Sequence, residues 1–309
     1  MKLSLFDLHC DTPYMMYNTK QPLMQNGLAV SLEKARNFAH YVQVMALWTN
    51  QTLSDTDGWN AALAMLQNLR DDEAIINQNA RIVTRFQNQN DERPTILLAV
   101  EDARILDGKL ERVDFLFELG VRILTPLWKG FTCIGGSHDT PYGLTDFGRK
   151  AMRRATKLGM IADISHASEA SADEIFEISD LQKRPVIASH SNSYKVCPVS
   201  RNLRDRQVSQ ILRMSGVIGL NLHMGFLRAD RQGTAADLLP HIDRFLELGA
   251  QNALCLGCDM DGCDLPSDIS TLKELPHLAE LMLRHGYSEA LIRNIFYENA
   301  ARFAQTYLK

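Results

Sequence analysis

The sequence predicts an α/β fold, a single (β/α)₈ TIM barrel over residues 1–309. Apolar runs of strand length alternate with segments of helical periodicity, which is typical of βα units and a parallel sheet. Eight such runs occur, and eight parallel strands close a barrel of this type. A length of 309 residues suits one α/β barrel, and no Pro-, Gly- or Ser-rich linker marks a second domain.

The expected strands follow one another in a regular order. They span residues 3–9, 41–47, 95–100, 121–126, 160–165, 186–189, 216–222 and 253–258. Between the fourth and fifth, residues 145–158 predict a helix with Thr145 as its N-cap and Gly159 at its end. The longest connection, residues 57–90, predicts one or two helices, and residues 270–283 and 288–307 predict the closing helices.

An open doubly wound sheet is the alternative that the same strand count allows. Such a sheet is expected to carry a glycine-rich phosphate turn after its first strand. Here the sequence HCDTP (residues 9–13) occupies that place. The barrel is therefore favoured, and in a barrel the chemistry gathers at the carboxyl ends of several strands.

Composition argues against two classes of partner. The 33 Lys and Arg residues against 37 Asp and Glu give a net charge of −4, and the basic residues are scattered, so no nucleic-acid partner is expected. No run approaches the roughly 20 apolar residues that cross a bilayer. Asp7, His9 and Asp11 interrupt the first apolar stretch before it could form a signal peptide. We therefore expect no membrane partner and a cytoplasmic protein.

The six cysteines are few for this length, and they predict reduced thiols instead of a disulfide framework. Cys255 and Cys258 form a CxxC pair, a pattern that can bind zinc or carry out redox chemistry. They lie in one apolar strand without a second such pair. We interpret them as small buried apolar side chains.

Metal-ligand candidates stand just past the ends of four expected strands: His9, Asp11, Glu101, His166 and His190. A single histidine at such a place is more often a hydrogen-bonded structural residue, but the recurrence at equivalent positions favours a metal site. Residues two apart on a strand point to the same side, so His9 and Asp11 can bind one ion together. The set exceeds the three ligands of a mononuclear catalytic zinc, and a carboxylate such as Glu101 can bridge two ions about 3.5–4 Å apart.

The chemistry expected of this set is hydrolysis. Imidazole with carboxylate suits Zn²⁺ best, although Mn²⁺, Fe²⁺ or Co²⁺ fit the same ligands, and a hydroxide shared by two such ions would be the nucleophile. The eighth strand ends in GCDMDG, which adds Asp259 and Asp261. Asp259 directly follows the strand and predicts a general acid/base that takes a proton from the bridging water and passes it to the leaving amine. Asp261, beside Gly262, is expected to support the loop.

Several motifs together resemble the membrane dipeptidase (renal dipeptidase) family of zinc peptidases, in the metal-dependent hydrolase superfamily. DLHCDTP resembles the family's opening D-G-H-x-D, and GLTDFGRKAMRRATKLGMIADISHAS resembles its G-L-T-x-F-G…L-G-M-x-x-D-x-S-H. VIASHS with SRNL resembles P-x-I-x-S-H-S…R-N, and GVIGLN and GCDMDG resemble the segments at strands seven and eight. Residues 49–90 and 127–141 carry little resemblance.

The resemblance implies a metallopeptidase that hydrolyses dipeptides, and it assigns the metal ligands. His9 and Asp11 match the ligands of one zinc, and His166 and His190 match those of the other. Glu101 matches the carboxylate that bridges the two ions. Because the family accepts a D-residue at the carboxyl-terminal position, L,D-dipeptides are among the expected substrates.

In the substrate site the resemblance is less complete. Arg201 matches the arginine that holds the dipeptide's free carboxylate, a task suited to a planar fork of donors, and Asp259 matches the acid/base aspartate. Where the family reads L-T-x-x-H, this chain reads LTPLWKG and places Trp128, whose indole cannot carry a positive charge. His223 stands where many relatives have a tyrosine. His138, in the loop GGSHD, is a candidate substitute whose position the sequence does not give.

Other functions stay open. One is hydrolysis of another amide, a lactone or a phosphoester on a related binuclear barrel, in which Lys129 could be carboxylated to bridge the metals, although Glu101 makes that lysine unnecessary. Another is a catalytically impaired barrel that only binds metal, but the intact ligand set and Asp259 argue against it. The sequence also leaves open whether the protein forms a homodimer and which dipeptides it would cleave.

Overall fold

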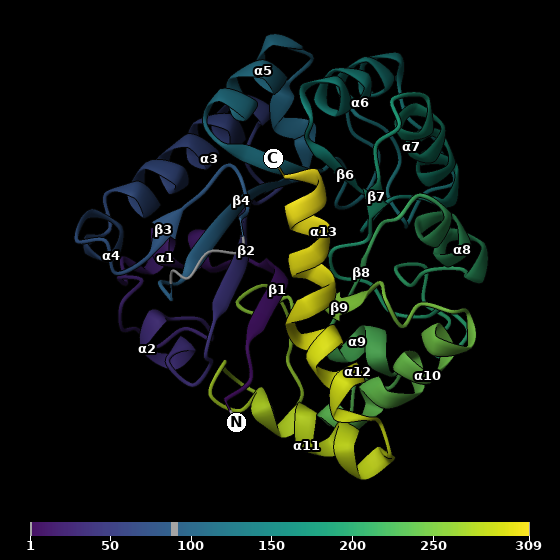
Figure 1. Cartoon of the computed structure of the whole chain (residues 1–309). Coiled ribbons are helices and arrows are strands. Elements are labelled where there is room, and N and C mark those ends of the chain that lie inside the picture. Colours follow the sequence, from purple (N-terminus) through teal and green to yellow (C-terminus); the bar gives the residue numbers. More distant parts are fainter. Residues whose placement is uncertain (1, 88–91, 309) are drawn as a thin grey trace.

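The computed structural model describes residues 2–87 and 92–308, and there nine parallel strands form one sheet that curves into a barrel (Figure 1). Neighbouring strands follow the order β7-β6-β5-β4-β2-β1-β9-β8, and the short β3 pairs with β4 outside this series. The bounds are β1 (Leu5–Cys10), β2 (Tyr41–Trp48), β3 (Arg81–Ile82), β4 (Thr95–Glu101), β5 (Val121–Thr125), β6 (Ile161–Asp163), β7 (Val186–Ile187), β8 (Ile218–Leu220) and β9 (Leu254–Leu256).

One bridge joins the two ends of this order. Ala188, just after β7, pairs in parallel with Ile218 of β8. The backbone N–H of Ala188 donates to the carbonyl of Val217 at 3.1 Å, and that of Gly219 donates to the carbonyl of Ala188 at 2.8 Å. The eight strands of the series therefore close on themselves, which confirms the predicted barrel.

Each of the eight expected strands is present, and several are shorter than the apolar runs that predict them. The run over residues 216–222, for example, contains only Ile218–Leu220 as strand. The connection over residues 57–90 holds two helices, α3 (Asp55–Arg70) and α4 (Glu73–Ile76). It also holds β3, which the sequence does not predict because two residues give no alternation to detect. Residues 88–90 of that connection, and residues 1 and 309 of the expected domain, lie outside the described part of the chain.

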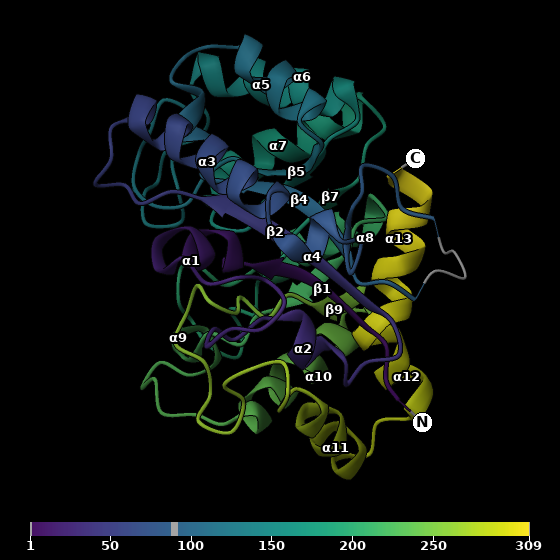
Figure 2. The same ribbon diagram turned by 90° about the vertical axis from the view of Figure 1, so that its left-hand side faces the viewer.

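Helices cover the outside of the barrel (Figure 2). In α6 (Asp146–Leu158), Thr145 Oγ1 accepts a hydrogen bond from the N–H of Gly148, and Gly159 ends the helix with a φ of 101°, as the sequence predicts. The others are α1 (Thr12–Thr19), α2 (Leu32–Ala35), η1 (Ala103–Leu106), α5 (Glu111–Glu118), α7 (Glu169–Leu181), α8 (Asp205–Arg213), α9 (Met224–Leu227), η2 (Ala235–Leu238), α10 (Leu239–Glu247), α11 (Pro276–His285), α12 (Glu289–Arg293), η3 (Asn294–Glu298) and α13 (Asn299–Tyr307).

The apolar core has two layers. The larger lies between strands and helices, and the smaller fills the barrel, where residues such as Phe6 and Leu97 point inward. Side chains of the last helix, among them Phe303 and Ala304, join this inner layer. Figure 1 shows α13 lying across the barrel. It closes the amino ends of the strands, so their carboxyl ends form the open face.

Two further expectations concern cysteines and membrane spans. The six cysteine thiols are free, and Cys255 and Cys258 are buried. Within residues 2–87 and 92–308, no helix has both the length and the apolar character that crossing a membrane requires.

Candidate metal centre

A cavity of about 550 Å³ opens at the carboxyl ends of the strands. Three of the predicted site residues, His9, His190 and Arg201, are buried beneath its wall. The other six reach the wall, which is lined by Asp11, Tyr14, Trp48, Glu101, Trp128, Lys129, His138, His166, His223, Phe226, Arg231, Asp259, Asp261 and Gly262. The structure thus brings all nine predicted residues to one end of the barrel.

The first strand carries His9 into the site through an irregularity near its end. Leu8 packs in the inner layer, so strict alternation would turn His9 outward. The pairing of β1 with β2 shifts register between Asp7 and Cys10, and Cys10 packs in the outer layer. His9 therefore lies on the inner side, where its ring stacks on that of His190 with centroids 3.7 Å apart.

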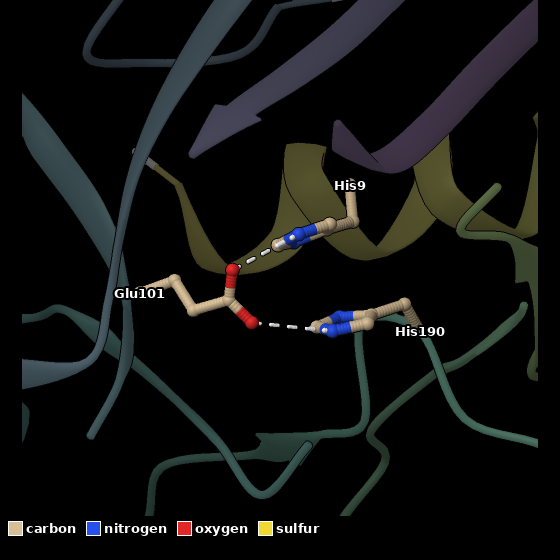
Figure 3. A group of neighbouring side chains, drawn as sticks. All are labelled: His9, Glu101 and His190. Carbon is tan, nitrogen blue, oxygen red and sulfur yellow. Dashed lines mark ion pairs between the residues drawn. The ribbon is translucent and has the colours of Figure 1, made fainter. Parts of the chain in front are cut away.

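Glu101, the last residue of β4, lies between histidines from other strands (Figure 3). Its Oε2 is 3.4 Å from His9 Nε2, and its Oε1 is 3.4 Å from His190 Nε2. The same Oε1 is 2.9 Å from His166 Nε2. The two carboxylate oxygens thus face different imidazoles, an orientation that suits a carboxylate bridging two ions.

His166 presents a bare nitrogen to the centre of the cluster. Its Nδ1 lies 3.1 Å from the backbone carbonyl of Trp128, which can only accept, so Nδ1 carries the hydrogen. In the neutral ring Nε2 is then an acceptor. It lies 3.0 Å from the Nε2 of His190.

Two buried polar atoms of the cluster have no hydrogen-bond partner in the described part of the chain, namely His9 Nε2 and Asp11 Oδ1. Leaving such an atom unpaired costs about 1–3 kcal/mol. The ligand atoms of His9, Glu101 and His190 lie within 4.8 Å of one another, and so do those of His9, Asp11 and Asp259. Imidazole nitrogens and carboxylate oxygens are ligands of zinc and similar ions, so the donor set fits divalent metal.

Burial and mutual charge shift the pKa values of the cluster. Burial raises the pKa of Glu101 to about 7, although His9 acts to lower it. Burial also raises the pKa of Asp259 to about 6. For His9 burial acts to lower the pKa, but the carboxylates of Glu101 and Asp11 outweigh it and hold the pKa well above its ordinary value. Strongly perturbed acids and imidazoles in one cavity are typical of a functional site.

Asp259 and Asp261 have different surroundings. The Oδ2 of Asp259 accepts a hydrogen bond from Asn221 Nδ2 at 3.1 Å, and its Oδ1 lies 3.8 Å from His9 Nε2. Asp261 accepts from the Thr12 hydroxyl at 2.7 Å and from two backbone amides of the segment before α2. The prediction that Asp261 supports the loop is confirmed, and Asp259 is left beside the cluster.

Arg201 lies behind His190, with 4% of its surface exposed. Its Nη1 donates to Ser191 Oγ at 2.8 Å, and its Nη2 donates to the carbonyl of His190 at 2.9 Å. Its Nε has no partner among the described residues. Burial lowers the pKa of this guanidinium to about 10. A guanidinium has five N–H donors, and these two bonds use two of them. Arg201 thus keeps unused N–H groups, among them that of Nε, which a substrate carboxylate could accept from.

Aromatic side chains line part of the cavity. The ring of Trp128 packs edge to face on Trp48, with centroids 5.0 Å apart, and Trp48 packs in the same way on Tyr14 at 4.7 Å. His223 and Phe226, whose centroids are 4.3 Å apart, also reach the cavity. The two residues that depart from the family pattern, Trp128 and His223, therefore both face the space where a substrate would bind.

The loop before α6 brings His138 to the cavity, which the sequence does not establish. Ser137 pairs with Ala167 in an antiparallel bridge, and the N–H of His138 donates to the carbonyl of His166 at 2.8 Å. The His138 ring lies 5.9 Å from that of His166, and its Nδ1 lies 2.9 Å from Ser200 Oγ. These contacts join segments far apart in the chain, so no local periodicity could have revealed them.

Comparison with known proteins gives a consistent result. A family model described as Membrane dipeptidase (Peptidase family M19) matches residues 1–307. Dipeptidase 3 of Mus musculus is 25% identical over 326 residues, a match that covers 96% of this chain. It covers 63% of the mouse protein, so this chain spans less than two thirds of that protein's length.

Solved structures resemble the whole chain. The crystal structure of dipeptidase AC, a metallo peptidase, matches with a TM-score of 0.92 at 26% identity. The match covers 100% of this chain and 99% of the other. A metallo peptidase of Rhodobacter sphaeroides, solved with a phosphinate mimic of the dipeptide L-Ala-D-Ala, has a TM-score of 0.89 at 25% identity. That match covers 99% of this chain and 100% of the other.

Proposed function

Because the chain belongs to the membrane dipeptidase family, peptidase family M19, we propose that it is a dipeptidase that hydrolyses the peptide bond of dipeptides with two divalent metal ions. The observation that carries the proposal is the cluster of His9, Asp11, Glu101, His166 and His190, whose donor atoms meet at the ends of four strands. Two of its possible ligand atoms, His9 Nε2 and Asp11 Oδ1, have no hydrogen-bond partner among the described residues, which supports a cation site.

We assign the ligands in two groups. His9 and Asp11 would hold one ion, on the side of the cluster that also contains Asp259. His166 and His190 would hold the other, and Glu101 would bridge the two. Zinc suits these donors best, and when bound, two such ions would polarise the peptide carbonyl and activate a shared water, as hydroxide, for attack.

Asp259 is proposed as the general acid/base. Its carboxylate lines the cavity beside His9, and Asn221 holds one of its oxygens. With a pKa of about 6 it is mostly ionised at neutral pH, so it can accept a proton from the attacking water. The protonated acid can then donate to the leaving amine, which would otherwise depart as an unstable anion.

The proposed substrates are dipeptides, including those with a D-residue at the carboxyl-terminal position. A relative of the same fold binds a phosphinate mimic of L-Ala-D-Ala, which supports this class. The cavity of about 550 Å³ has the size of a small-molecule site.

Arg201 is proposed to hold the dipeptide's carboxylate through its unused Nε. We expect Arg201→Ala to raise KM for free dipeptides and to change it little for substrates whose carboxyl group is blocked. Steady-state kinetics on both substrate types measures this. Equal losses on the two would assign Arg201 to the support of Ser191 and His190 instead.

The oxyanion of the transition state needs a donor, and Trp128 stands where the resemblance places the family's histidine. We propose that His138 takes over this task. Its Nδ1 lies 2.9 Å from Ser200 Oγ, and with Ser200 as the donor there, the hydrogen of the neutral ring is on Nε2 and can be offered to the substrate in the cavity. Burial lowers the pKa of His138 to about 4, so it acts as a neutral donor.

The alternative functions have less support. A carboxylated Lys129 is not required, because Glu101 already lies between the imidazoles while Lys129 is exposed. A barrel that binds metal without catalysis would not need Asp259 beside the cluster. Hydrolysis of another small amide on the same residues remains the second candidate, which Trp128 favours because its large ring reshapes the cavity.

The full chain, purified and loaded with Zn²⁺, tests the proposal. We expect elemental analysis to give about two metal ions per chain, and L-Ala-D-Ala and L-Ala-L-Ala to be hydrolysed in a metal-dependent manner. A chelator-treated sample is the control. A stoichiometry that stays at one after saturation would remove the binuclear assignment, and two bound ions without turnover of any dipeptide would favour the alternative hydrolase.

A further inference from the structure

A polar layer lies inside the barrel directly beneath the proposed ligands, and the proposed function gives it no role. On β5, β6 and β7 the inner layer contains Ile123, Ile161 and Ile187. The residue two positions after each isoleucine is polar and buried. These residues are Thr125, Asp163 and Ser189. Side chains two apart on a strand share a face, so these three replace the apolar layer by hydroxyl and carboxylate groups.

Asp163 accepts four hydrogen bonds. Its Oδ2 receives the hydroxyls of Thr125 at 2.6 Å and Ser189 at 2.5 Å, and its Oδ1 receives the N–H groups of Ser165 and Ser189, both at 2.9 Å. A carboxylate offers about four acceptor sites, and here donors take them all. Asp163 is therefore an acceptor only, with no proton of its own to give.

This count fixes the direction of the next bond. Ser189 Oγ has a single hydrogen, and it points to Asp163, because two oxygens at 2.5 Å with no hydrogen between them would repel each other. Toward His190 Nδ1, 2.6 Å away on its other side, Ser189 Oγ can only accept. His190 therefore carries its hydrogen on Nδ1 and presents Nε2 as a lone pair.

The backbone around Ser189 leaves little freedom for another arrangement. A Cβ atom on Gly219 of β8, or on Gly257 just after β9, would lie 1.8 Å from the carbonyl oxygen of Ser189, so both positions need glycine to let this residue approach. The N–H of His190 is in turn held by Ser165 Oγ at 3.1 Å. The relay from Asp163 to the imidazole is thus rigidly built into the barrel.

We propose that Asp163 and Ser189 are positioning residues that fix the tautomer of His190 and thereby hold its Nε2 ready for one of the two metal ions. The inference rests on the metal ligands assigned under the proposed function. With His166 also protonated on Nδ1, two lone pairs face each other across the 3.0 Å between the Nε2 atoms, so only a cation makes this contact favourable. The chain of hydrogen bonds from Asp163 through Ser189 to His190 would fix the orientation of the imidazole and raise its basicity as a ligand, as carboxylate–histidine pairs do at metal sites.

The first experiment reads the tautomer directly in the metal-free protein. Long-range ¹H–¹⁵N correlation spectra of histidine-labelled protein distinguish the two tautomers. We expect the His190 signal, assigned by its loss in His190→Gln, to show the hydrogen on Nδ1. A hydrogen on Nε2 would overturn the proposal without any mutation of the relay.

The second experiment removes the acceptor. In Ser189→Ala the Nδ1 hydrogen loses its partner, so we expect zinc affinity at one site to fall by about 10–100-fold while the other site is kept. Competition with a chromophoric chelator measures both affinities, and the His190 spectrum should show a mixture of tautomers. Ser189→Thr, which keeps the hydroxyl, should restore both the affinity and the Nδ1 form.

Thr125→Val is the matched control. It removes a hydroxyl group that donates to the same Asp163 carboxylate but does not contact the His190 imidazole. We expect it to lower stability but to leave both zinc affinities unchanged. Equal affinities in Ser189→Ala and in the parent protein, or an equal loss in Thr125→Val, would reduce the relay to a structural role. The parent's own zinc stoichiometry and dipeptide turnover test the proposed function separately, so the two failures are distinguishable.

Discussion

Three residues of the candidate site adopt left-handed backbone conformations, which residues with a Cβ rarely do. His166 has a φ of 71°, Asp259 of 61° and Asp261 of 67°. Such a conformation costs about 1–3 kcal/mol, and it persists only where the surrounding structure holds it. Each residue lies just past a strand end, where the chain turns sharply above the barrel. Substitutions there must separate loss of chemistry from added backbone strain.

Asp259→Asn meets this condition, because asparagine also tolerates a positive φ and keeps the shape of the side chain. We expect the variant to retain its metals and fold and to lose about 10²–10⁴-fold in kcat, the usual effect of removing a positioned acid/base group. Elemental analysis, circular dichroism and steady-state kinetics together measure this. Turnover near that of the parent would move the acid/base role to another residue.

His138→Ala tests the proposed oxyanion donor. Removal of one such donor is expected to lower kcat by about 10²–10³-fold with KM and metal content nearly unchanged. Trp128→His added to that variant should restore part of the loss, because the carbonyl of residue 128, not its ring, holds His166. If His138→Ala is fully active, the metal ions alone support the oxyanion, and the single Trp128→His variant then shows whether the indole shapes the cavity.

Six of the nine site residues are predicted at one end of the barrel because the end of a parallel strand can be located from its apolar run, namely His9, Asp11, Glu101, His166, His190 and Asp259. The other three, Arg201, Trp128 and His223, are implied only by the family resemblance. The sequence could not orient them. His9 faces inward only through the register shift in β1, and regular alternation predicts the opposite. The position of His138 at the cavity and the burial of Arg201 are also not predictable from the sequence, since both depend on contacts between loops that are separated along the chain.

At the scale of helices and strands, the elements with local signals were predicted best. Thr145 and Gly159 mark both ends of α6 because capping is decided within one turn of helix. The two-residue β3 and the bridge that closes the barrel have no such signal. Their pairing depends on the whole sheet, so only the folded structure contains the information.

Helix α10 offers a test of stability at this scale. His241 is fully buried, its Nδ1 accepts from the N–H of Ser193 at 3.0 Å, and its Nε2 donates to the carbonyl of Leu227 at 3.1 Å. The neutral ring thus joins α10 to the loop at Ser193 and to the end of α9, and protonation would break the bond from Ser193. Burial accordingly lowers the pKa of His241 to about 4.

The sign of the pH effect follows from this shift. In the unfolded chain the imidazole titrates near 6.5, so between about pH 6.5 and pH 4 the unfolded state binds more protons. His241 therefore lowers the free energy of unfolding as pH falls through this window, by on the order of 3 kcal/mol in total. Urea unfolding at several pH values measures this in the metal-free protein. The free energy of unfolding of His241→Asn should decline less steeply with falling pH than that of the parent. His40→Asn, at an exposed position, is the control, and parallel curves for parent and His241→Asn would contradict the prediction.

The whole molecule separates two tasks between the ends of one barrel. The amino ends of the strands are closed by α13, whose Phe303 and Ala304 complete the inner apolar layer. The carboxyl ends carry the buried acids and imidazoles, including Asp7, Asp163 and the proposed ligands. Counting strands from the sequence predicts this polarity, because it is a property of every parallel barrel. The relation of α13 to the barrel interior is not predictable in this way, since an amphipathic helix looks the same wherever it packs.

Because the proposed ligands come from strands spread around the barrel, bound metal should stabilise the entire fold. An ion that binds only the folded state contributes about 2.7 kcal/mol at a hundred times its dissociation constant. For 309 residues one kcal/mol shifts the unfolding midpoint by about 1.5 °C, so two sites give a shift of about 8 °C. Differential scanning calorimetry of zinc-loaded and chelator-treated protein measures this. Ser189→Ala is expected to keep about 60–75% of the shift at the same free zinc concentration, because a site weakened by about 10–100-fold still contributes about 0.4–1.4 kcal/mol. An unchanged midpoint after verified metal removal would mean that the cluster is held by its own hydrogen bonds, and the unpaired His9 Nε2 and Asp11 Oδ1 would then need another partner.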